Sequence, residues 1–387
     1  MTAALLANIP WEMLAWSVAK AVFIIFLVVL PLVSYTVYAE RRVSAAIQDR
    51  VGPNRTGIPT SLLGFKKDIQ LFLGGLGQPI ADAVKFIFKE DFTPAGVKHF
   101  YFWLAPVLAM LPLVSLAFIP FGSTFLGEKM VIADVSVSVL GIFAVTGCGV
   151  YAIVLAGWAA NSKYPFLGGI RSTSQMISYE LSMGLSIIPV LMLFGGMQLS
   201  SLVEYQAANG WLLLPFWGKG LSLERWLMLL PLGISFIVFM ISVFAETNRL
   251  PFDLPESETE LVAGYHTEYS SMKFALFFLG EYVAMIVGSA LAVVFFFGGW
   301  HLPFIPNGAG EGGLSFLNFL PDWIWGIVNI GVFFGKVTVL LIFFIWVRWT
   351  LPRFRFDQLM RIGWLYLFEI ALANIFLTAA IIALTNK

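Results

Sequence analysis

Several long apolar runs of the sequence contain carboxylates. Glu180, Glu281 and Glu369 each lie within such a run, and Glu40 and Glu246 close two others. Ionisable residues inside membrane-spanning helices are costly and usually mark proton or ion pathways. Buried acids beside basic partners can be poised to exchange protons near neutral pH. We therefore expect these acids to form a polar path inside an otherwise apolar protein.

The composition places the chain among membrane proteins. Of the 387 residues, 59% are hydrophobic and 12% are charged, whereas a soluble domain carries about 25% charged residues. The formal net charge of +0 gives no reason to expect a nucleic-acid partner. Cys148 is the single cysteine, and an iron–sulfur cluster needs about four. The three histidines are scattered, so we expect no metal or haem site, and any electrons must come from a partner.

The apolar runs predict the elements that position these acids. About 20 apolar residues span a bilayer as a helix, because backbone groups in lipid must be satisfied within the segment. We predict an all-α polytopic membrane protein with one transmembrane domain over residues 1–387. Its eight spans are expected at about 16–38, 101–121, 134–158, 173–196, 228–249, 271–297, 324–347 and 361–384.

Segment 77–90 differs from the spans. Ile80, Val84, Ile87 and Phe88 recur on one helical face, while charged residues lie off that face. The pattern predicts an amphipathic helix on the cytoplasmic surface of the membrane. Packing of the same face against a partner subunit is an equally good interpretation.

The distribution of basic residues predicts the orientation. Loops that follow the odd-numbered spans carry or border 17 Lys and Arg residues, against four on the opposite side. These loops should face the cytoplasm and both termini the outside. Glu180, Glu281 and Glu369 would then lie about 10, 15 and 12 Å from the cytoplasmic ends of their spans. The alternative is that some acids form static pairs, for example with Lys336 in the seventh span.

Three cytoplasmic segments carry unusual sequence. Segment 40–57, ERRVSAAIQDRVGPNRTG, runs from a basic helix end into a turn. Segment 246–282 contains the acidic stretch PFDLPESETELVAGYHTEY, and segment 352–360, PRFRFDQLM, places two arginines beside the membrane. A solvated loop and contact with anionic lipid are the simpler explanations of the last two.

Together with SYELSMGLSII around Glu180, these segments resemble the quinone-site membrane subunit of respiratory complex I, NADH:quinone oxidoreductase, over nearly the whole chain. The resemblance implies a subunit of a proton-translocating enzyme in the bacterial inner membrane, with ubiquinone or menaquinone as substrate. It implies no metal, flavin or iron–sulfur cluster on this chain. The implied partners are other membrane subunits, peripheral-arm subunits with the terminal iron–sulfur cluster, and the lipid bilayer.

The resemblance also implies the residues of the site, none of them directly catalytic. Quinone would enter between the first span, the surface helix and the sixth span. The residues lining the chamber would be Glu40, Arg41, Asp82, Arg249, Glu256, Glu258, Arg348, Arg353 and Arg355. Glu180, Glu246 and Glu281 would form the proton path, and Glu369 has no clear counterpart.

Other functions fit parts of the sequence. The equivalent subunit of an energy-converting hydrogenase shares parts of the loop motifs, although the long acidic stretch favours the NADH enzyme. A stand-alone transporter would be expected to show internal repeats, and none is visible. A purely structural anchor would leave the acids inside the spans unexplained.

Overall fold

The computed structural model describes residues 11–54, 56, 75–125, 127–214, 223–256, 258–302 and 321–385. It confirms an all-α polytopic fold, with eight helical segments long and apolar enough to cross a membrane. These segments are Ala15–Ile47, His99–Phe118, Ser138–Ala159, Lys163–Phe194, Arg225–Glu246, Ser271–Phe296, Trp323–Thr350 and Phe356–Thr385.

Most spans are single α-helices, and three are composite. The first joins α2 (Trp11–Val22), η1 (Phe23–Val29) and α3 (Leu30–Ile47). The second joins α5 (His99–Leu108), α6 (Leu111–Ser115) and η3 (Leu116–Phe118), and the last joins α14 (Phe356–Arg361), η6 (Ile362–Leu367) and α15 (Phe368–Thr385). The single helices are α7 (Ser138–Ala159), α8 (Lys163–Phe194), α10 (Leu223–Glu246), α12 (Ser271–Phe296) and α13 (Asp322–Thr350).

Two helix boundaries differ from the prediction by about ten residues. The first helix continues to Ile47 rather than ending near 38, and α8 begins at Lys163 rather than near 173. Both extra stretches contain polar residues, so an apolar run underestimates a helix that extends beyond the lipid. Glu180 consequently lies about 25 Å from the start of its helix, and the matched depths expected for the acids do not hold when measured from the helix starts.

Shorter elements connect the spans. α4 (Gln78–Phe88) matches the predicted surface helix and exposes Ile87 and Phe88 at its end. On the side opposite α11 (Glu258–Leu261) and α14 lie α9 (Leu199–Asn209) and an antiparallel hairpin of β1 (Thr124–Phe125) and β2 (Glu128–Lys129). The 3₁₀ turn η4 (Gly264–His266) follows α11 and packs on α7 and α8.

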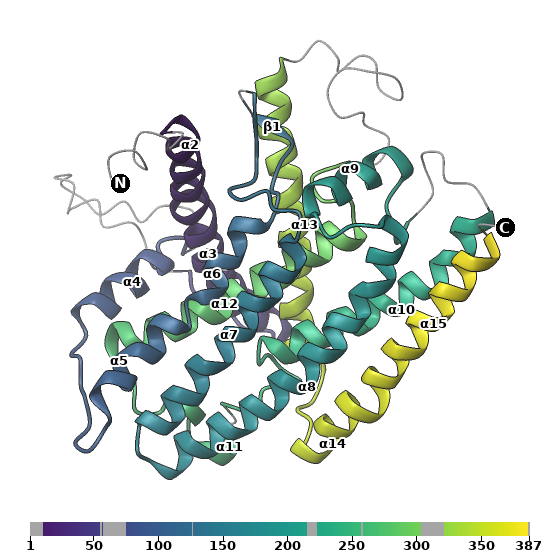
Figure 1. Cartoon of the computed structure of the whole chain (residues 1–387). Coiled ribbons are helices and arrows are strands. Elements are labelled where there is room, and N and C mark those ends of the chain that lie inside the picture. Colours follow the sequence, from purple (N-terminus) through teal and green to yellow (C-terminus); the bar gives the residue numbers. More distant parts are fainter. Residues whose placement is uncertain are drawn as a thin grey trace, which may run out of the picture.

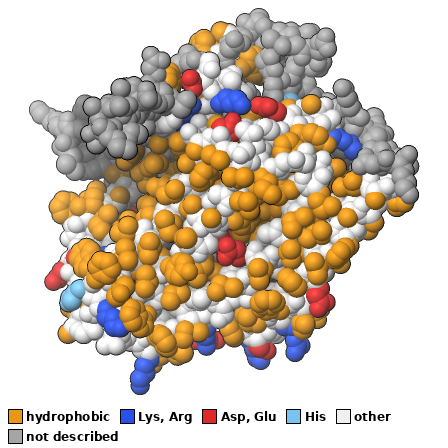
Figure 2. All heavy atoms as spheres, viewed as in Figure 1, with side chains coloured by type: hydrophobic (Ala, Val, Ile, Leu, Met, Phe, Trp, Pro, Cys, Tyr) orange, Lys and Arg blue, Asp and Glu red, His pale blue; other side chains and the backbone are white. Residues whose placement is uncertain are grey.

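The core is centred on α12. This helix is the most enclosed of the described spans, and it contacts α10, α13, α3 and α4. α7, α8, α10 and α15 run beside one another across the molecule (Figure 1). Hydrophobic side chains cover most of the face in Figure 2, with Lys and Arg mainly along its lower edge and a second group near the top. This distribution fits a protein surrounded by lipid.

Candidate functional site

A network of four charged residues and a tyrosine joins three helices and the loop after α10. Glu40, from α3, accepts a hydrogen bond of 2.5 Å from the hydroxyl of Tyr282 on α12. The same carboxylate pairs with Arg348 of α13 and lies 3.5 Å from the Nη1 atom of Arg249. The Cζ atom of the Arg249 guanidinium also lies 4.3 Å from the centre of the Tyr282 ring. We call Glu40, Arg249, Glu281, Tyr282 and Arg348 the inner charge cluster.

Arg249 connects the two carboxylates of the inner charge cluster. Its Nε atom lies 2.6 Å from Oε1 of Glu281, and only about a tenth of each of these side chains is exposed. Burial is the largest single influence and disfavours a charged guanidinium, but Glu281, Tyr282 and Glu256 together outweigh it and raise the pKa of Arg249 above its ordinary value. Arg249 therefore remains cationic. Two acids and two bases make the cluster formally neutral, so one added charge would alter every pair.

The chain reaches this geometry through a tight turn at the end of α10. Asn248 has a positive φ of 51°, a conformation that asparagine tolerates better than most residues. The fully buried Gln175 side chain on α8 donates 2.8 Å hydrogen bonds to the backbone carbonyls of Ala245 and Phe252. One side chain thus holds both ends of the turn, which places Arg249 between α3 and α12.

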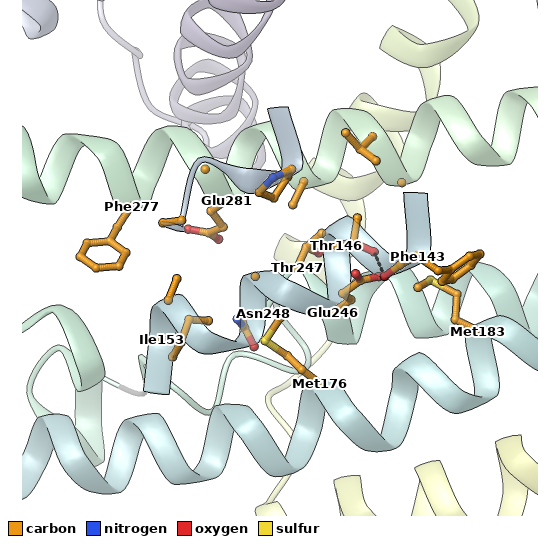
Figure 3. Close-up of a pocket in the computed structure, with 18 of the residues that line it drawn as sticks. Phe143, Thr146, Ile153, Met176, Met183, Glu246, Thr247, Asn248, Phe277 and Glu281 are labelled. Carbon is orange, nitrogen blue, oxygen red and sulfur yellow. Dashed lines mark hydrogen bonds between the residues drawn. The ribbon is translucent and has the colours of Figure 1, made fainter. Parts of the chain in front are cut away.

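A cavity of about 80 Å³ lies beside the inner charge cluster, among α6, α7, α8, α10 and α12. Most of its lining is apolar, including Phe143, Met176 and Phe277. Figure 3 shows Glu281 reaching it from α12, with Glu246 and Asn248 at the end of α10. Glu281 is therefore shared between the cluster and the cavity. A cavity lined by two carboxylates and an amide can hold water.

Glu180 lies next to this cavity without being among the residues that line it. A Cβ atom built on Gly147 of α7 would stand 2.6 Å from Oε1 of Glu180, so the acid packs directly on this glycine. Among the residues that the structure describes, neither Glu180 nor Glu246 forms an ion pair, in contrast to Glu40 and Glu281.

Three further contacts organise the surroundings of the cluster. Arg41 pairs with Asp82 at 2.9 Å and joins α3 to the surface helix α4. Arg353 pairs with Asp253 at 2.9 Å, next to a backbone hydrogen bond from Phe354 to Pro251. The loop after α10 is thereby tied to the segment before α14.

Glu256 stands 3.8 Å from Nδ1 of His266. Burial lowers the pKa of His266 to about 4, so the imidazole is neutral at pH 7 and this contact is no ion pair there. Burial also raises the pKa of Tyr265, which lines the cavity, well above its ordinary value. Both rings therefore act as neutral groups near the acids.

Some predicted residues lie away from the cluster. Arg355 is exposed at the start of α14, and Glu369 is exposed on α15, so Glu369 does not belong with the other acids. The side chain of Glu258 falls outside the described residues. The suggested pairing of Lys336 with Glu281 or Glu369 is wrong, because Lys336 binds backbone carbonyls instead.

Three residues of the site, Tyr282, Gln175 and Asn248, were not predicted from the sequence. Tyr282 directly follows Glu281, and this adjacency of two polar residues inside an apolar span was the available signal. Gln175 was a further polar residue within a predicted span. Nothing in the sequence indicated which backbone groups it would bind.

No group of His, Cys, Asp and Glu suited to a metal ion occurs among the residues with described positions. The site offers a hydroxyl donor, carboxylates and guanidinium groups. Such a set can stabilise an anion and transfer protons.

Comparison with known proteins gives consistent matches. A family model described as NADH dehydrogenase matches residues 19–379. The H 1 subunit of NADH-quinone oxidoreductase from Geobacter metallireducens is 44% identical over 366 residues, covering 93% of this chain and 95% of that protein. The H subunits of the same enzyme from Rickettsia felis and Rickettsia prowazekii are 47% and 48% identical, each over 356 residues, with 92% of this chain and 90% of the relative covered. The matched region includes the inner charge cluster and the cavity.

Proposed function

Because the chain belongs to the family of NADH-quinone oxidoreductase H subunits, we propose that it forms much of the chamber in which complex I reduces quinone and that it couples this reduction to proton movement. As a complex I subunit it works with the other subunits of that enzyme. The names of the relatives favour this role over that of a hydrogenase-type subunit. No part of the proposal requires a redox centre on this chain.

Quinone reduction to quinol consumes two electrons and two protons. In the proposed role the electrons come from an iron–sulfur cluster of the peripheral arm, and this chain supplies electrostatic stabilisation and protons. An electron added to a buried quinone creates negative charge where solvation is poor, which is costly. Arg348, Arg249 and the Tyr282 hydroxyl can stabilise such an anion if the quinone head group approaches Glu40.

The observation that carries the proposal is the shared position of Arg249. One guanidinium contacts Glu40 on one side and Glu281 on the other, and Glu281 lines the cavity that also contains Glu246. A new anion near Glu40 would draw Arg249 away from Glu281. Glu281 would then take up a proton from the cavity, so that the charge on quinone is converted into a proton transfer. Glu246 and Glu180 would extend the path.

We place the polar pocket on the inner side of a bacterial plasma membrane, with both termini outside. The excess of Lys and Arg in the loops around α4, α11 and α14 supports this orientation. In this arrangement α4 lies at the membrane surface between α3 and α12, where its exposed apolar face meets lipid. A hydrophobic quinone could then approach the cluster from the inner leaflet.

Substitution of Glu246 and Glu180, which form no ion pair within the described part of the chain, tests the coupling. We expect Glu246→Gln and Glu180→Gln to lower NADH:quinone reductase activity of the intact complex by about 10- to 100-fold, while NADH:ferricyanide activity, which reports the peripheral arm, stays at the wild-type level. Glu369→Gln is the matched control, since this exposed acid should be dispensable. Wild-type quinone rates in both cavity variants would refute the proton path. Loss of assembly would instead indicate a structural role for the acid concerned.

A further inference from the structure

Lys336 of α13 is a charged side chain inside a span that the proposed mechanism does not use. Its Nζ atom donates to three backbone carbonyls, those of Phe297 at 2.7 Å, Gly299 at 2.8 Å and His301 at 2.6 Å. The ammonium also lies 4.2 Å from the centre of the Trp211 ring. No ion pair of Lys336 occurs within the described ranges.

The geometry suits the charged form of lysine. An ammonium group has three N–H donors, and each of the three carbonyls accepts one. The acceptors lie at and just beyond the C-terminus of α12, where backbone carbonyls have no partner within the helix and a positive charge is favoured by the helix dipole. Lys336 is therefore a helix cap supplied by the neighbouring helix.

The other backbone carbonyls at this helix end accept hydrogen bonds from neutral groups. Gln206 of α9 donates to the carbonyls of Val294 and Phe295, and the backbone N–H of Leu213 donates to the backbone carbonyl of Phe296. Each carbonyl from 294 to 297 thus has a donor. Among these described donors, Lys336 alone is charged and alone belongs to α13.

α12 and α13 are joined a second time at the inner charge cluster. There Glu40 binds Tyr282 of α12 and Arg348 of α13 with one carboxylate. From Lys336 to Arg348 is about 18 Å along α13, and from Phe297 back to Tyr282 is about 22 Å along α12. The contact between Lys336 and the end of α12 consequently limits how far α12 can slide or rotate against α13. It thereby also sets the positions of Tyr282 and Glu281.

We propose that Lys336 is a positioning residue for quinone reduction. By holding the outer end of α12, it keeps the Tyr282 hydroxyl on Glu40 and the Glu281 carboxylate on Arg249. This inference rests on the proposed function, because the positioned groups matter only if the inner charge cluster serves the reaction. Lys336 acts through α12 and touches no reacting atom.

A double-mutant cycle in the intact complex tests the proposal. Lys336→Met keeps the length of the side chain and removes its charge and donors, while Tyr282→Phe removes the hydroxyl at the other end of α12. We expect each variant to lower the quinone-dependent rate about 5- to 100-fold, since small misplacements of reacting groups are costly. The double variant should stay within about two-fold of Tyr282→Phe. Residues so far apart normally act independently. If the rate reduction in the double variant equals the product of the two single reductions, the proposal is overturned.

Asn329→Leu is the matched control on the same helix. Asn329 donates to Ser123 at 2.8 Å and does not contact α12 through this bond, so its loss should leave the quinone rate unchanged. If Lys336→Met does not assemble, Lys336→Gln, which keeps an amide donor, replaces it in the cycle. Failure of both to assemble while Asn329→Leu assembles would make Lys336 a stability residue and overturn positioning.

The two proposals fail in different ways. A wild-type quinone rate in Tyr282→Phe would remove the role of the inner charge cluster itself. A reduced rate in Tyr282→Phe combined with a wild-type rate in Lys336→Met would overturn only the inference about Lys336.

Discussion

Replacing Arg249 by Met removes a cation that contacts two buried carboxylates, Glu40 and Glu281. Glu40 would keep Arg348 as its partner, but Glu281 has no second base among the described residues. Only about a tenth of the Glu281 side chain is exposed, so water cannot replace the lost partner fully. Glu281 should therefore become protonated, and the cluster would lose the proton uptake by Glu281 that we assign to it.

The magnitude follows from the burial of the pair. Breaking a buried ion pair by removing one partner costs about 3–5 kcal/mol, and about 1.4 kcal/mol corresponds to a ten-fold change in rate. If the pair acts in the reaction, we expect the quinone-dependent rate to fall at least about 100-fold. A purely structural pair would instead lower assembly or thermal stability and leave the rate per assembled complex unchanged.

Arg249→Met combined with Glu281→Gln separates these cases. Replacing both partners by neutral groups of similar size is often nearly neutral for stability, so the double variant should recover assembly, as judged by native gels and NADH:ferricyanide activity. The quinone rate should stay low, because the proton-accepting carboxylate is absent. Recovery of the quinone rate together with assembly would refute our reasoning and leave the pair a structural link.

Other substitutions probe the surroundings. Gly147→Ala would place a methyl group 2.6 Å from Glu180 Oε1 and should lower the quinone rate several-fold, whereas Gly184→Ala on α8, which meets nothing within 4 Å, should not. Gln175→Leu removes buried hydrogen bonds to the turn after α10 and should destabilise the complex by about 2–4 kcal/mol, with faster hydrogen exchange in residues 245–252; unchanged exchange would contradict this. Burial lowers the pKa of His266 from 6.5 to about 4. The His266 contribution to the free energy of unfolding is therefore complete above pH 6.5, and the free energy should fall by up to about 3 kcal/mol between pH 6.5 and 4. His266→Phe should show a weaker dependence in thermal unfolding across that window, and an equal dependence would exclude His266 as its source.

The apolar pattern of the sequence determined the number and type of the spans. A run of about 20 apolar residues in lipid must satisfy its own backbone hydrogen bonds, and a helix does so locally. The same pattern marks where the lipid is rather than where the helix ends. For this reason the predicted ends were too short for the first helix and for α8, both of which continue into polar sequence.

The side of its helix on which each acid lies decided which acids belong together. Glu281 and Glu369 had similar predicted depths, yet Glu281 faces Arg249 in the interior while Glu369 is exposed on α15. Depth depends only on distance along a helix, and this can be counted from the sequence. Facing depends on which side of the helix is packed, and that is set by its neighbours.

By itself, the sequence determined an α-helical membrane protein with acids inside its spans, because lipid constrains each segment separately. Only the tertiary structure decided that Arg249 would meet both Glu40 and Glu281, and that Lys336 would cap α12 rather than pair with an acid. These partners are far apart in the chain. Their contacts depend on how helices cross and turn against one another, which no local pattern specifies.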